Sequence, residues 1–92
     1  ETFNTPELRF PVEERRKFAA IAEVQARLAQ SDADMVAIDG VRVTTPDGWW
    51  LLRASNTQGV LTARAESDSA EGLERLIGQI DAQLALSGLA RS

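Results

Sequence analysis

A short polar run, Arg53-Ala54-Ser55-Asn56-Thr57, lies between two apolar segments that are typical of strands. It places one guanidinium, two hydroxyls, one amide and several backbone N–H groups on a single turn. N–H groups on a turn lie outside any strand ladder, and a guanidinium donates bidentate hydrogen bonds to phosphate oxygens. The run therefore predicts a site for a phosphate dianion. Serine, asparagine and threonine are also ordinary turn residues, so a plain surface turn is the alternative.

Other charged residues carry weaker signals. Arg64 lies one predicted strand away from Arg53. It either adds charge to the phosphate site or is a cross-strand surface residue. Asp32, Asp34 and Asp39 lack the regular ligand spacing of a calcium loop, which favours solvated turn carboxylates. No metal site is predicted in this chain.

The composition excludes several classes of protein. The chain has 92 residues, 43% of them hydrophobic and 26% charged, which is typical of one globular domain. No apolar run approaches the roughly 20 residues that span a bilayer, and no signal peptide is recognisable. The absence of cysteine and histidine removes disulfides, thiolate chemistry and the commonest metal ligand and general base. A net charge of −4 argues against a nucleic-acid partner. A cytoplasmic location fits these features.

The hydrophobic periodicity predicts an alternation of strands and helices. The expected order is β-α-β-β-β-β-α, which places both helices on one face of an antiparallel sheet in an α+β fold. The expected elements are a strand over 5–10, a helix over 12–30, strands over 35–38, 41–45, 49–53 and 60–66, and a helix from about 68 to 87.

Several local features are also predicted. Asp39-Gly40 is the signature of a two-residue type I′ hairpin. Asp68 and Glu71 have the spacing of a capping box at the start of the last helix. Residues 1–4 are expected to be a linker, and residues 87–92 a loose tail.

Three expectations concern side-chain placement. One of Trp49 and Trp50 is expected in the core, and the other exposed or at an interface; the pattern leaves open which is which. Arg42 is expected to point outward from its strand. The mixed-charge run 13–17 is typical of a solvated helix face.

The stretch D-G-V-R-V-T-T-P-D-G-W-W-L-L-R-A-S-N-T-Q-G-V-L-T-A-R-A-E resembles the C-terminal domain of the α-D-phosphohexomutases, on the phosphomannomutase/phosphoglucomutase branch. The upstream segment T-P-E-L-R-F-P-V-E-E-R-R-K-F resembles the family's entry into this domain. The resemblance implies a TATA-binding-protein-like fold. It also implies that the R-x-S-N-T loop binds the substrate phosphate, through Arg53, Ser55, Asn56 and Thr57. Relatives often have proline two residues after the threonine; Gln58-Gly59 here predicts a more flexible loop.

The resemblance implies a role within a larger enzyme. Such mutases interconvert hexose 1-phosphate and hexose 6-phosphate, using a phosphoserine and a magnesium ion bound by an aspartate-rich loop, and neither loop occurs in this sequence. The chain would then bind and orient phosphate, require no cofactor of its own, and be inactive alone. Its partners would be a hexose phosphate and the other domains of the same polypeptide. Met35 is the only methionine, which also suggests a C-terminal piece of a longer chain.

The rival hypothesis is a stand-alone interaction module. Its open sheet face would bind a protein, and residues 55–57 would form a plain turn. A domain of this fold class suits either function, because a fold does not fix a function.

Overall fold

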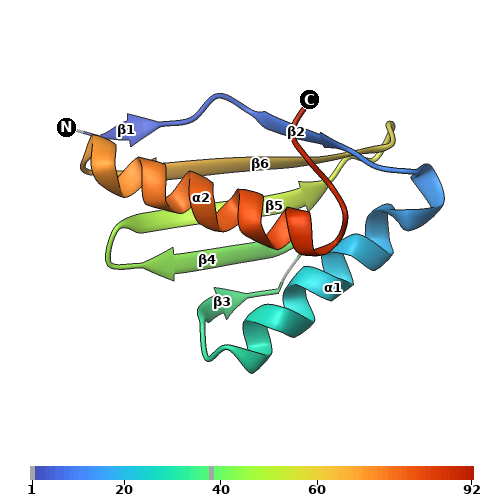
Figure 1. The fold of residues 1–92 in the computed structure, drawn as a ribbon, viewed down its shortest axis with the longest axis horizontal. Coiled ribbons are helices and arrows are strands. Elements are labelled where there is room, and N and C mark those ends of the chain that lie inside the picture. Colours follow the sequence, from blue (N-terminus) through green and yellow to red (C-terminus); the bar gives the residue numbers. More distant parts are fainter. Residues whose placement is uncertain (1, 38) are drawn as a thin grey trace.

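The computed structural model describes residues 2–37 and 39–92. Figure 1 shows two helices, α1 and α2, on the same face of one sheet. The elements are β1 Phe3–Asn4, β2 Leu8–Pro11, a 3-10 turn Glu14–Arg16, α1 Lys17–Gln30, β3 Asp34–Val36, β4 Val41–Thr45, β5 Gly48–Ala54, β6 Val60–Ser67 and α2 Ala70–Leu86.

The sheet is antiparallel throughout its described pairings. Its order is β1-β6-β5-β4-β3, and β2 also pairs with β6, so both N-terminal strands lie along one edge. The central strands β5 and β6 pair along nearly their whole length, with Arg53 opposite Thr62 and Leu51 opposite Arg64. The predicted α+β fold, with both helices on one face of an antiparallel sheet, is confirmed.

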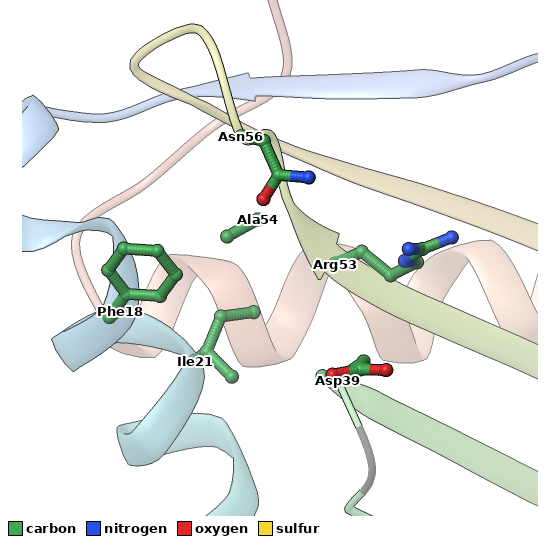
Figure 2. Close-up of a pocket in the computed structure, with 7 residues that line it drawn as sticks. Phe18, Ile21, Asp39, Arg53, Ala54 and Asn56 are labelled. Atoms are coloured by element: carbon green, nitrogen blue, oxygen red, sulfur yellow. The ribbon is translucent and has the colours of Figure 1, made fainter.

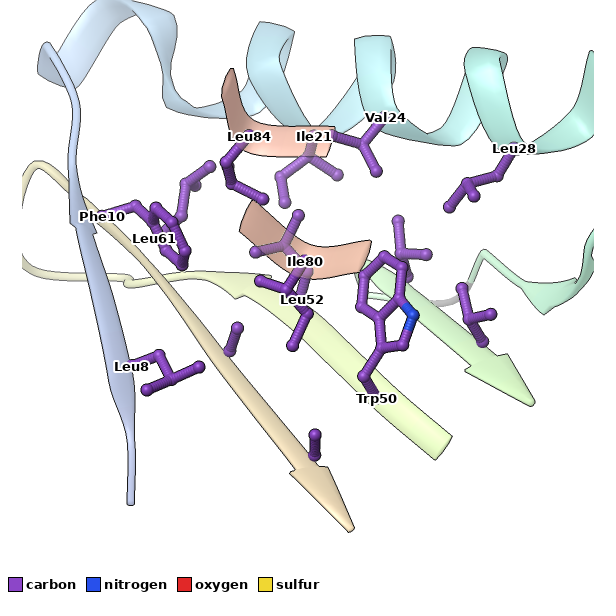
Figure 3. Close-up of a cluster of buried hydrophobic side chains, with 14 of the residues drawn as sticks. Leu8, Phe10, Ile21, Val24, Leu28, Trp50, Leu52, Leu61, Ile80 and Leu84 are labelled. Carbon is purple, nitrogen blue, oxygen red and sulfur yellow. The ribbon is translucent and has the colours of Figure 1, made fainter. Parts of the chain in front are cut away.

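Strand alternation decides which tryptophan is in the core. Trp50 and Leu52 lie on the helix-facing side of β5 and are fully buried. Figure 3 shows them beside helix residues such as Ile80 and Ile21. The indole N–H of Trp50 donates to Gln79 Oε1 at 3.0 Å, so its polar atom is satisfied. Successive strand residues point to opposite faces, so the half-buried Trp49 lies on the open face of the sheet.

The cap of α2 differs from the prediction. Ser69, in extended conformation, is the N-cap, and its hydroxyl accepts a hydrogen bond from the Gly72 N–H at 2.9 Å. A capping box between Asp68 and Glu71 is therefore wrong by one residue. Serine and aspartate cap about equally well, so residue type alone does not distinguish Asp68 from Ser69.

The turn between β3 and β4 also differs. Val36 lies opposite Arg42, so the connection is centred on Asp39. A two-residue type I′ turn at Asp39-Gly40 does not fit this register. Both residues still have positive φ, 55° and 130°. Ile38, part of the predicted strand, lies outside the described residues.

Both ends of the chain are more closely held than the sequence predicts. Phe3–Asn4, within the predicted linker, pairs with β6 as strand β1. In the predicted loose tail, Arg91 forms an ion pair with Asp81 at 2.9 Å. The Ser92 N–H donates to the carbonyl of Arg9 at 3.0 Å. The tail therefore crosses back to β2.

Candidate phosphate site

The predicted phosphate run lies where β5 ends and turns into β6. Arg53 is the last but one residue of β5, and it is exposed on the open face because it alternates with buried Leu52. Ser55 is half-buried, whereas Asn56 and Thr57 are exposed at the turn. The Ser55 N–H donates to the Val60 carbonyl at 3.0 Å, which closes the turn.

The backbone of the turn is less open than the sequence predicts. The Ser55 hydroxyl accepts from the N–H groups of Thr57 and Gln58, each at 3.3 Å. Such long hydrogen bonds are weak, and an anion is a stronger acceptor than a hydroxyl. The Asn56 N–H donates to no other acceptor among the described residues. Three N–H groups of the turn, those of Ser55, Thr57 and Gln58, thus already have an acceptor within the protein.

A hollow of about 410 Å³ lies beside the turn. Figure 2 shows the Asn56 side chain above it, the Phe18 ring on the far side, and the Arg53 guanidinium extending away over the sheet. Asp39 also lines the hollow, so its rim carries both signs of charge. The lining residues are Phe18, Ile21, Asp39, Gly40, Arg53, Ala54 and Asn56.

Three arginines share the open face near this hollow. Arg42 and Arg64 are both opposite Leu51, one on each neighbouring strand, and Arg53 follows two residues later on the same face. Arg64 and Arg53 are thus diagonal neighbours, while only Arg53 borders the turn. Among residues 2–37 and 39–92, no carboxylate lies within 4.0 Å of these guanidinium groups. Arg42 instead lies over the Trp49 ring, 4.5 Å from its centre, and points outward as expected.

One cation in the site was missed by the sequence reasoning. Lys17 belongs to the run that was expected to be a solvated helix face, yet it is only 1% exposed. Its ammonium donates to the Gln58 carbonyl at 3.1 Å and pairs with Glu14 at 2.7 Å. The prediction of a solvated face is wrong for Lys17, because the segment after β2 folds against the turn. No signal in the sequence singles out Lys17, because the helix was predicted to begin at residue 12 and this lysine then falls beyond its first turn.

Residues 7–83 match the family model described as "Phosphoglucomutase/phosphomannomutase, C-terminal domain". This match covers most of the chain. The chain belongs to this family.

Individual relatives agree. The chain is 45% identical over 73 residues to a phosphomannomutase/phosphoglucomutase of Pseudomonas aeruginosa, covering 79% of this chain and 16% of that protein. It is 36% identical over 84 residues to a phosphoglucomutase of Neisseria meningitidis, covering 89% and 18%. A crystal structure of a phosphoglucomutase/phosphomannomutase family protein from Burkholderia thailandensis superposes with a TM-score of 0.78 at 32% identity, covering 96% and 18%. The chain thus spans less than a fifth of these relatives.

Two further observations concern metal ions and membranes. The described residues contain no group of three or more histidine, cysteine, aspartate or glutamate side chains that could hold a metal ion. The magnesium implied by the family resemblance therefore does not fit the part of this chain that the structure describes. No helix within residues 2–37 and 39–92 has the length and apolar character to cross a membrane.

Proposed function

We propose that this domain binds the phosphate of a hexose phosphate in a phosphomannomutase/phosphoglucomutase. One observation carries the proposal most: an exposed arginine, Arg53, stands immediately before a polar turn and has no carboxylate partner among the described residues. A buried or paired arginine at this position would have its charge satisfied within the protein. The family match supports the same role.

The proposed contacts divide by chemistry. Arg53 supplies a bidentate charge-assisted contact, and the hydroxyls of Ser55 and Thr57 donate at short range. Asn56 supplies its amide and its backbone N–H. The Thr57 and Gln58 N–H groups exchange their long bonds to the Ser55 hydroxyl for bonds to phosphate oxygens. The Ser55 hydroxyl only accepts in those bonds, so its own proton is available to donate. Arg64 adds positive charge from the neighbouring strand.

The contribution to catalysis is positional. In the proposed enzyme a phosphoryl group moves between the 1- and 6-positions of a hexose. Holding the non-reacting phosphate uses remote binding energy to orient the reacting end. The phosphoryl donor and the metal ligands would come from other domains, so the isolated chain is inactive. Those domains are its proposed partners, they meet the open face around Leu51 and Trp49, and the whole enzyme acts in the cytoplasm.

The proposal is tested in a full-length mutase that carries this domain. Arg53→Ala lowers kcat/KM about 10- to 100-fold, since the loss of a charged hydrogen-bonded contact costs about 1.5–3 kcal/mol. Both KM and kcat change, because the contact also orients the reacting end. Arg15→Ala is the matched control, as Arg15 is an exposed arginine that pairs with Glu13, away from the turn. Equal kinetics for the Arg53 variant and the wild type would contradict the proposal.

A further inference from the structure

The burial of Lys17 opposes two ordinary preferences. A buried ammonium loses hydration, and a cation in the first turn of a helix faces the positive end of the helix dipole. Lys17 is the first residue of α1 and is almost fully buried. Its position is therefore unfavourable for the helix and must be offset by the contacts that its ammonium makes.

Those contacts join the helix start to the phosphate turn. The ammonium donates to the Gln58 carbonyl at 3.1 Å and pairs with Glu14, which is itself largely exposed. It also lies 5.5 Å from the centre of the Phe18 ring, on the wall of the hollow beside Asn56. The bond to Gln58 connects the start of α1 to a residue 41 positions away in the chain.

The end of the turn is fixed at further points. The Gln58 side-chain oxygen accepts from Arg9 Nη2 at 2.6 Å. The Val12 N–H donates to the Gly59 carbonyl at 3.0 Å, and a Cβ at Gly59 would lie 2.6 Å from the Val12 carbonyl oxygen. Gln58-Gly59, expected to loosen the turn, is thus packed against the segment after β2.

We propose that Lys17 is a positioning residue for phosphate binding, acting through the Gln58 carbonyl. A trans peptide group is planar, with its C=O and N–H on opposite sides. The Gln58 carbonyl accepts from Lys17 and also, at 2.9 Å, from the Val60 N–H, so the two donors together fix the plane of the Gln58–Gly59 peptide and point the Gly59 N–H away from the lysine. The turn is held in one conformation before the anion arrives, which lowers the cost of binding. This inference rests on the proposed phosphate role of the turn.

The test compares backbone amide exchange and phosphate affinity in Lys17→Met, which keeps the length of the side chain and removes the charge. The hydrogen-bonded amides of the turn, those of Ser55, Thr57, Gln58 and Val60, exchange about tenfold faster, the size expected for one lost charged hydrogen bond, while those of Leu52 and Ala63 are unchanged. The dissociation constant for inorganic phosphate rises about three- to tenfold on the same basis. Lys17→Arg keeps a cationic donor, and it therefore retains most of the amide protection and most of the phosphate affinity of the wild type.

Arg15→Met is the matched control. It also removes one positive charge, two positions before Lys17, but from a side chain that is exposed. It leaves both measurements unchanged. Should Lys17→Met fail to fold, Lys17→Gln replaces it, with the same expected pattern.

Two results overturn the inference. One is unchanged exchange and affinity in the lysine variants; the other is faster exchange throughout the sheet, which indicates a merely structural lysine. A wild-type chain that shows no phosphate response contradicts the proposed function instead. The exchange of residues 55–60 then decides by itself whether Lys17 holds the turn.

Discussion

Two groups of arginines in this domain use their hydrogen-bond donors in opposite ways. Between the helices, Arg27 donates to the Gln83 side-chain and backbone oxygens at 2.9 and 2.8 Å and to the Ser87 hydroxyl at 2.8 Å. Ser87 in turn donates to Glu23 at 2.7 Å, and Arg16 pairs with the same carboxylate. On the open face, the three arginines around Leu51 have no such acceptors among the described residues.

The difference separates stability from binding. Donors that end on protein acceptors hold α1 to the C-terminal end of α2, and their loss leaves partly buried groups unpaired. Exposed donors without an acceptor contribute little to folding, and they remain available to an anion or to another protein surface. The chain as a whole is acidic, with a net charge of −4, so the three arginines form a local positive region on an otherwise acidic protein.

The largest expected effect is on the helix side. Arg27→Met lowers the free energy of unfolding by about 1.5–3 kcal/mol, because it strands the Gln83 and Ser87 acceptors. Urea denaturation measures the loss. Phosphate-induced shifts in the folded variant stay as in the wild type. A loss of stability no larger than that of Arg53→Met would break the distinction between the two groups.

A pair of glycine substitutions compares the turn with a helix. Gly59→Ala lowers the free energy of unfolding by about 1–3 kcal/mol, since its Cβ meets the Val12 backbone. Gly78→Ala, in α2, raises the free energy of unfolding by about 0.5–1 kcal/mol, because the added Cβ would meet no described residue beyond the neighbouring backbone of its own helix. Thermal or urea unfolding of both variants measures whether the free energy of unfolding falls or rises. Stabilisation by Gly59→Ala would show that the turn is not packed as described.

The helix-side network also predicts a pH dependence. The Ser87 hydroxyl and then Arg16 hold the pKa of Glu23 below its ordinary value of 4.5. The unfolded state binds the proton more readily, so this contribution is present above pH 4.5 and is lost as the pH falls through the folded pKa. The difference in unfolding free energy between wild type and Glu23→Gln should therefore shrink below pH 4.5. If this difference in unfolding free energy stayed constant down to about pH 3, roughly one unit below the average glutamate pKa in folded proteins, that result would argue against the network.

The smallest expected effect is on the open face. Arg53→Met changes the free energy of unfolding by no more than about 0.5 kcal/mol, the range of an ordinary surface substitution. The measurement is urea denaturation at neutral pH. A larger loss would mean that Arg53 has a structural acceptor and is not reserved for a ligand.

The sequence predicted the fold because strand alternation and helical spacing are local signals. The same alternation, with its period of two, places Arg53 on one face with Trp49 and Leu51. It left open which tryptophan is buried, since that depends on which face the helices cover. The register at Asp39 was wrong because residues with positive φ suit several turn lengths.

Lys17 was missed for a different reason. In the sequence it stands among four other charged residues with nothing to distinguish it. Its burial arises only when the segment after β2 returns to the β5–β6 turn, a contact between residues 41 positions apart. The same contact explains why Gln58-Gly59 forms a packed turn without proline.

The central claim is tested most directly by titrating the ¹⁵N-labelled chain with inorganic phosphate. The account predicts saturable shifts of the amides of residues 55–59 and of the Arg53 side-chain signal, with roughly millimolar affinity for one dianion in a half-open site. Arg53→Met abolishes these shifts, and Arg15→Met keeps them. Amides of residues 55–59 that stay still, or that move no more than those near Asp32 and Asp47, would contradict the account and favour a plain turn.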